Sequence, residues 1–146
     1  MRRTRFDEES CPIARVTDLL GDWWTPLVLR ELLYGRSRFD EIQNRLGISR
    51  PILSQRLRRL ETEDMVQRVQ YQESPPRYEY RLTAKGEASW EVVAALWRYG
   101  SDWFFPEGPP GELYDSTTDQ TIMPQVVDGN TGKPIERATA RIRARN

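Results

Sequence analysis

Apolar side chains recur at the three- and four-residue spacing of α-helices in four successive segments of the N-terminal half. This periodicity predicts helices over residues 12–20, 26–34 and 39–46, and a fourth within residues 47–63. Glycines stand between these segments, where a helix ends and the chain turns (Gly21, Gly35 and Gly47). The second segment is apolar on nearly every side, so we expect its helix to lie in the core.

Polar residues mark where these helices begin. Thr25 followed by Pro26 predicts a start, with threonine as the N-cap and proline at the first helical position. The segment Ser37–Asp40 resembles a capping box ahead of the third helix. Ser49 is predicted to cap the fourth helix, whose first turn tolerates Pro51 because the amides there lack intrahelical partners.

Alternating apolar and polar positions follow the fourth helix. Residues 65–72 and 77–82 alternate as strands do, and the stiff loop 73–76 between them contains two prolines. These segments predict a β-hairpin. Thr83 is then expected to cap one long helix that continues to about Phe105.

The composition changes at Pro106, where a linker rich in proline and glycine begins. We expect a mobile N-terminal arm at residues 1–10, one domain at residues 11–105, and a C-terminal extension at residues 106–146. Within the extension, residues 126–135 are compatible with one small β-hairpin.

The expected fold class is mainly α with a small β-hairpin (α+β). A short helix, a glycine-containing turn and an exposed basic helix form the layout of a helix-turn-helix. A hairpin directly after this motif has the position of a wing, and the long last helix is available for dimerisation. We therefore predict a winged helix-turn-helix whose fourth helix enters a DNA major groove.

The distribution of charge supports this prediction although the formal net charge is zero. Residues 1–60 carry 12 Lys and Arg against 8 Asp and Glu, and the excess is acidic further along the chain. Five arginines (Arg45, Arg50, Arg56, Arg58 and Arg59) lie between Glu41 and Glu61 with no acidic residue among them. Because the excess is small, we expect only modest non-specific affinity for DNA.

Several other classes of protein find little support in the composition. The chain has no histidine, which removes the common Ser-His and Cys-His triads and the usual zinc sites. No phosphate-binding glycine motif is present, so we expect no enzyme, no metal and no cofactor. A single cysteine and the lack of a signal peptide or of an apolar run of about 18 residues indicate a cytoplasmic protein without a membrane span.

Five blocks within residues 11–104 resemble, in order, the HxlR-type winged helix-turn-helix regulators of bacteria. They are CPI from Cys11, GDWWTPLVLRELLYG from Gly21, RFDEIQNRLGIS from Arg38, LSQRLRRLE from Leu53 and PPRYEYRLTAKG from Pro75. The resemblance implies a small homodimeric repressor or activator whose first and last helices build the dimer interface. The order Arg50-Pro51 departs from the family, which often has proline and then a basic residue after the cap serine. The segment after Phe105 lies outside the resemblance.

The fourth helix supplies the candidate DNA contacts. Arg50, Ser54, Gln55 and Arg58 share its outer face, and arginine and glutamine can bond guanine and adenine edges bidentately. Arg56 and Arg59 lie towards the flanks, where they would bind phosphates or pair with acids such as Glu63. Ser49 is predicted to be a further contact to the DNA backbone. The alternative for the whole face is an ordinary solvated basic helix.

The wing and the N-terminus add two candidates. Arg77, next to the wing tip, could enter a minor groove or touch phosphate, or be an ordinary exposed charge. Cys11 is expected at a helix N-terminus with Arg15 four residues on, where the dipole and the cation favour thiolate. The resemblance implies sensing of oxidants or electrophiles there, while many lone cysteines are simply small buried hydrophobes.

Aromatic residues in the last helix suggest a second copy of the chain. The five tryptophans (Trp23, Trp24, Trp90, Trp97 and Trp103) could line a pocket for a small-molecule effector, although such residues more often fill cores and interfaces. The predicted function is a homodimeric, sequence-specific regulator that binds an inverted repeat in double-stranded DNA. The alternative is a protein-interaction module that uses a winged-helix fold without DNA.

Overall fold

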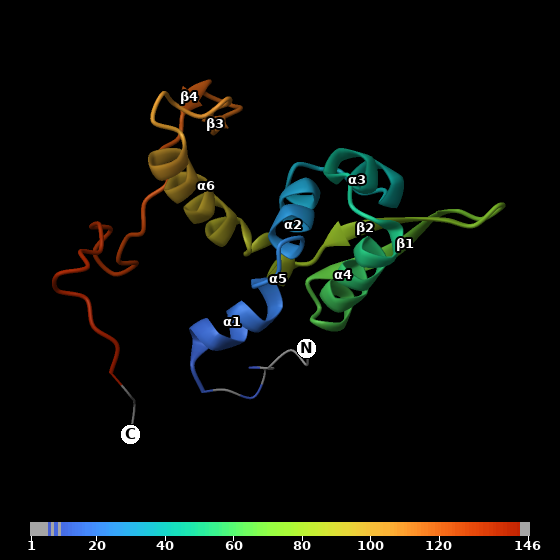
Figure 1. Ribbon diagram of the computed structural model, residues 1–146, viewed down its shortest axis with the longest axis horizontal. Coiled ribbons are helices and arrows are strands. Elements are labelled where there is room, and N and C mark those ends of the chain that lie inside the picture. Colours follow the sequence, from blue (N-terminus) through green and yellow to red (C-terminus); the bar gives the residue numbers. More distant parts are fainter. Residues whose placement is uncertain (1–5, 7, 9, 144–146) are drawn as a thin grey trace. The chain divides into compact units, whose positions relative to one another are not determined.

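The computed structural model describes residues 6, 8 and 10–143 (Figure 1). Most of the predicted N-terminal arm therefore lies outside the described residues. The contacts divide the chain into an N-terminal unit, residues 1–93, and a C-terminal unit, residues 94–146.

The N-terminal unit is a winged helix-turn-helix, which confirms the predicted fold class. Its elements are α1 (Pro12–Leu20), α2 (Thr25–Leu33), α3 (Phe39–Leu46), α4 (Arg50–Thr62), β1 (Val66–Gln72), β2 (Arg77–Leu82) and α5 (Ala84–Glu87). Gly47, in the left-handed conformation at φ 64°, forms the turn between α3 and α4. Figure 1 shows α3 and α4 side by side with α2 beside them.

One apolar core holds α2, α3, α4 and the start of β1 together. Its buried residues are Val28, Leu29, Leu32, Ile42, Ile48, Leu53, Leu57, Leu60, Met65 and Val66. The three leucines of α4 recur at spacings of four and three, so this helix buries one face and leaves the other free. The core thus fixes which arginines of α4 face outward.

Two of the predicted helix starts are wrong in detail. Thr25 is already helical, and the N-cap residue is Trp24. The capping carboxylate is that of Asp22, which accepts hydrogen bonds from the amides of Trp24 and Thr25 at 2.8 and 2.9 Å. An aspartate side chain can accept hydrogen bonds from amides two and three residues ahead. Because Asp22 does so here, Thr25 is not needed as the cap. The α3 cap is Arg38 and not Ser37, because Glu41 reaches back to the Arg38 amide at 3.2 Å.

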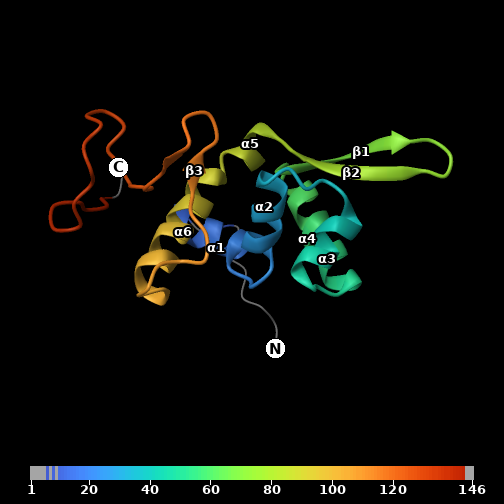
Figure 2. The ribbon, with the colours of Figure 1, turned by 90° about the horizontal axis from the view of Figure 1, so that it is seen from above.

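The wing is an antiparallel hairpin with an irregularity between Gln70 and Gln72. Figure 2 shows it extending beyond α3 and α4. Its base is attached to the helix-turn-helix by a hydrogen bond from the Tyr80 amide to the Ser37 carbonyl, at 2.7 Å. The predicted strands are confirmed, and this bond anchors β2 beside the start of α3.

The prediction of one long helix after Thr83 is wrong. The structure has two helices there, α5 and α6 (Trp90–Phe104). Thr83 does cap α5, accepting a bond from the Gly86 amide at 3.1 Å. The buried Ser89 ends it: both its amide and its hydroxyl donate to the Gly86 carbonyl, at 3.0 and 2.6 Å. A serine that bonds the preceding turn in this way competes with the regular helical pattern.

Replacing Gly86 with alanine is expected to lower the free energy of unfolding by about 1–3 kcal/mol. An ideal Cβ at this position would overlap the Met65 carbonyl oxygen, so α5 would have to move away from the start of the wing. Thermal and urea unfolding would measure the loss. Gly100→Ala, at a helical position where a Cβ meets nothing within 4 Å, is the control and should not destabilise. Equal stability of the two variants would contradict this packing.

The C-terminal unit contains α6 from Ala94 onward and two short strands, β3 (Tyr114–Asp115) and β4 (Gln120–Thr121). The sequence interpretation missed this hairpin. Its turn is built by Asp115, and bonds from the Thr117 and Thr118 amides hold the pKa of that carboxyl below its ordinary value. Further along, Val127 and Pro134 form a single bridge around the Asp128 loop.

Candidate nucleic-acid interface

A groove of about 750 Å³ lies between the helix-turn-helix and the wing, and is called the interface groove here. Five arginines line it, together with acidic and aromatic side chains (Arg38, Arg50, Arg58, Arg68, Arg77; Asp40, Glu41, Glu61; Phe39, Tyr71, Tyr78, Tyr80). Such a basic, aromatic-rich concavity beside an exposed helix matches the chemistry of a nucleic-acid backbone.

Three of the four predicted base contacts line this groove: Arg50, Ser54 and Arg58. Arg58 is exposed, and the part of the chain that the structure describes contains no acidic side chain paired with it. Gln55 is exposed on the same helix but does not line the groove. Arg58 is therefore the arginine of α4 most available to an external ligand.

Arg50 is held in place by its neighbours. Its guanidinium lies 3.3 Å from the Asp40 carboxylate and 4.7 Å from the centre of the Phe39 ring. The side chains of both charged residues are mostly exposed, so the ion pair itself is weak. The contacts nevertheless orient Arg50 at the N-terminus of α4, where Ser49 is the exposed N-cap.

Sequence reasoning missed two further arginines that line the groove, Arg68 on β1 of the wing and Arg38 at the start of α3. Arg68 stacks on Tyr78 at 3.7 Å from the ring centre, and Arg38 stacks on Tyr71 at 4.8 Å. Stacking on an aromatic ring orients a guanidinium without neutralising its charge. The Arg68–Tyr78 pair depends on the pairing of β1 with β2, and the Arg38–Tyr71 pair depends on the packing of the wing beside α3. Spacing along the sequence could not have indicated either pair. The predicted wing contact, Arg77, is exposed and also lines the groove.

Tyr80 lies at the inner end of the groove and packs against the core. Burial raises the pKa of its phenol above 10.0, against the opposing effect of Arg68. The phenol is neutral at physiological pH, as an ordinary tyrosine is, and so adds no negative charge to the groove.

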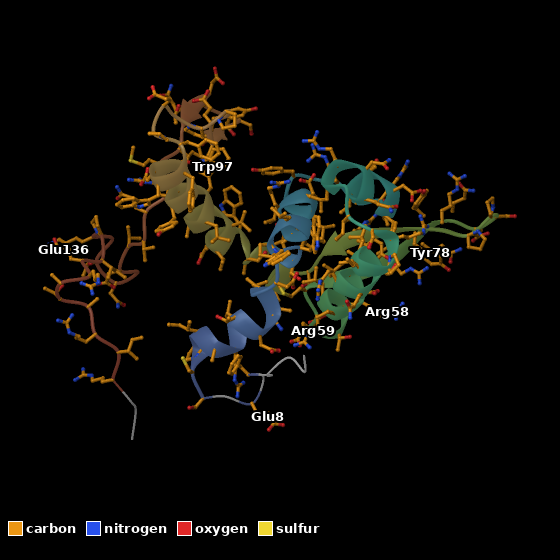
Figure 3. The ribbon with its side chains drawn as sticks, viewed as in Figure 1. Glu8, Arg58, Arg59, Tyr78, Trp97 and Glu136 are labelled. Carbon is orange, nitrogen blue, oxygen red and sulfur yellow. The ribbon has the colours of Figure 1, made fainter. Side chains whose placement is uncertain are left out.

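Arg56 and Arg59, on the flank of α4, are engaged within the protein. Arg56 pairs with Asp22 at 3.2 Å, and Arg59 pairs with both Asp18 and Glu63 at 3.0 Å. The acid-paired alternative foreseen for Arg59 and Glu63 is thus what the structure contains. Figure 3 shows Arg59 on the side of α4 nearer α1, with Arg58 further toward the wing.

Cys11 is the exposed N-cap of α1, with its carbonyl accepting a bond from the Arg15 amide at 3.2 Å. Exposed apolar side chains accompany it on α1 (Ile13 and Val16) and occur along α6 (Trp90, Val92, Leu96, Tyr99, Trp103 and Phe104). Trp24 packs against the core, whereas Trp23 is 89 % exposed. Large apolar side chains are thus exposed to water on both α1 and α6.

Within residues 6, 8 and 10–143, no three or more His, Cys, Asp or Glu side chains gather as metal ligands would. No helix in that part of the chain is both long enough and apolar enough to span a bilayer.

Comparisons with known proteins agree with this architecture. A family model described as HxlR-like helix-turn-helix matches residues 19–108. The uncharacterized HTH-type transcriptional regulator Rv3095 of Mycobacterium tuberculosis is 38% identical over 132 residues, which cover 90% of this chain and 82% of the relative.

Solved structures show the same likeness. The transcription factor candidate PA1607 matches with a TM-score of 0.86 and 35% identity, over 96% of this chain and 99% of that one. The redox regulator HypR in its oxidized form matches with a TM-score of 0.58 and 29% identity, over 63% of this chain and 96% of its own. The likeness to PA1607 thus includes the C-terminal unit. The family model and these relatives show that the chain belongs to the HxlR-like helix-turn-helix transcriptional regulators.

Proposed function

We propose that this regulator binds an inverted repeat in double-stranded DNA as a homodimer, with α4 in the major groove and the wing against the backbone. The observation that carries the proposal is the exposed Arg58, without an acidic partner among the described residues, beside Arg50 and Ser54 in a groove that α4 shares with the wing. An arginine so placed can bond guanine O6 and N7.

The roles divide by position. Arg50, Ser54, Gln55 and Arg58 read base edges from the outer face of α4. Ser49, at the start of that helix, and Arg77, on the wing, bind the sugar-phosphate backbone. This division predicts which variants change specificity and which change affinity for all DNA alike.

The second copy of the chain covers the exposed apolar side chains of α1 and α6. Burying them against water supplies the driving force for the dimer. Two-fold symmetry then presents two α4 helices to half-sites about 34–36 Å apart. The proposal requires no cofactor or metal, assigns no enzymatic activity and places the protein in the cytoplasm with its DNA.

Cys11 is proposed as a sensor of oxidants or electrophiles. Its exposure at the N-cap of α1 gives reagents access to the thiol, and the relative HypR is a redox regulator. Modification there would disturb the apolar surface that α1 offers to the partner. A small-molecule effector that acts at the same surface is compatible with this mechanism.

A protein-interaction module without DNA is the second candidate, favoured by the zero net charge. Salt dependence distinguishes the two. A DNA complex should weaken steeply with salt, by about 0.9 in the slope of log K against log salt for each phosphate neutralised.

The experiment is selection of duplexes by the purified protein from a randomised library, followed by affinity measurements at several salt concentrations. We expect a two-fold symmetric sequence bound far more tightly than random DNA, with a steep salt slope. Enrichment of no sequence would favour the interaction module. Cys11→Ser then tests sensing: oxidation should release the selected duplex from the native protein but not from the variant.

A further inference from the structure

The end of α1 is tied to α4 by a buried ion pair. The Asp18 side chain is 4% exposed and accepts a bond from Arg59 Nη2 at 3.0 Å. Its other oxygen, Oδ1, accepts the Phe6 amide at 3.3 Å. A buried carboxylate that loses its cation is costly, so this contact strongly favours one position of α4 relative to α1.

A second ion pair lies one turn away. Arg56, three residues before Arg59, places its Nε 3.2 Å from Oδ1 of Asp22, and these side chains are 21% and 14% exposed. Asp22 itself caps α2, so α4 is tied at this point to the junction between α1 and α2. The two acids and the two arginines thus pair α4 with the end of α1 and with the turn that follows it, and we name these contacts the α1–α4 clamp.

The clamp departs from the phosphate role foreseen for these two arginines. Arg59 is 31% exposed and already pairs with two carboxylates, Asp18 and Glu63. These carboxylates already occupy Arg59 Nη2 and offset its charge, whereas Arg58 next to it has no such acidic partner within the described residues.

We propose that Arg56 and Arg59 are positioning residues, which transmit the placement of α1 to the recognition helix α4. This inference rests on the proposed function, in which α1 carries part of the dimer surface. Because the Arg59–Asp18 pair is also a directional hydrogen bond, a shift of α1 against its partner would change the direction of α4. The spacing of the two recognition helices would then depend on α1, and with it the fit to both half-sites.

The alternative is that the clamp only stabilises the fold. An apolar replacement separates the two possibilities, because exchanging a buried ion pair for apolar residues often preserves or raises stability while removing the directional bonds. The variant is Asp18→Leu with Arg59→Leu, which also leaves the net charge unchanged. Glu63→Gln, which removes the more exposed partner of Arg59, is the matched control.

The first measurement is the ratio of affinities for the duplex selected by the native protein and for a random duplex. We expect the double variant to stay folded and dimeric, to bind random DNA as the native protein does, and to lose about tenfold in this ratio. Glu63→Gln should keep the ratio. An unchanged ratio in the double variant would show that the clamp is only structural. An equal loss on both duplexes, with a shallower salt slope, would make Arg59 a phosphate contact.

The second measurement is amide hydrogen exchange in α1 with and without the selected duplex. In the native protein, binding at α4 should slow exchange in residues 12–20, and in the double variant this effect should disappear. Persistence of the effect in the double variant would overturn the inference.

If the native protein selects no duplex, the proposed function is wrong, and the clamp is then tested without DNA. Exchange in α1 without DNA should rise in Arg59→Gln and not in Glu63→Gln; equal exchange in the two would overturn the clamp as well.

Discussion

Arg58→Ala is expected to weaken binding to the selected duplex by about 1–3 kcal/mol while leaving affinity for random DNA nearly unchanged. Arg58 is exposed in the interface groove and, within the described residues, has no carboxylate to share its charge with. Its removal therefore breaks no ion pair among the described residues, so the loss of binding should come mainly from the DNA contact. Competition between selected and random duplexes, at one fixed salt concentration, gives the difference directly.

Arg77→Ala provides the contrast on the wing. A phosphate contact should lose affinity equally on both duplexes and reduce the salt slope by about 1. Should Arg58→Ala behave in this way too, Arg58 would be a backbone contact and base reading would fall to the remaining residues of the outer face. Selection repeated with the variant would then return the native sequence.

Leu53→Ala is expected to lower the free energy of unfolding by about 2–5 kcal/mol. Leu53 is fully buried between α4 and the other core helices, so truncation leaves a cavity and loses apolar burial. A domain of this size is stable by only about 5–15 kcal/mol, so this is a large fraction of the total. Urea unfolding followed by tryptophan fluorescence would measure it.

Gln55→Ala is the matched control on the same helix. Gln55 is exposed, and surface changes of this kind usually stay within about 0.5 kcal/mol. At temperatures well below unfolding, Gln55→Ala should lower DNA affinity more than Leu53→Ala does, although it has the smaller effect on stability. A Leu53→Ala protein as stable as the control would contradict the assignment of this face of α4 to the core.

The sequence was sufficient for the order and type of most elements in the N-terminal unit. Helical spacing of Leu53, Leu57 and Leu60 determines which face of α4 is buried, because a helix can bury only one stripe against a core. Strand alternation around the two prolines was likewise sufficient for the wing. Two predictions were wrong because of local side-chain hydrogen bonds. The Asp22 carboxylate, and not Thr25, caps the start of α2, and Ser89 ends α5 by bonding the Gly86 carbonyl.

Only the tertiary structure decided what each arginine does. Arg58 and Arg59 are neighbours in the sequence with the same chemistry, yet Arg58 faces the groove and Arg59 pairs with a buried carboxylate 41 positions away. Likewise, Arg68 stacks on Tyr78 because the register pairs Arg68 with Tyr80 and so places Tyr78 diagonally across the hairpin from it. The physical reason is that periodicity reports the direction of a side chain from its own helix or strand, whereas its partner depends on how distant elements pack.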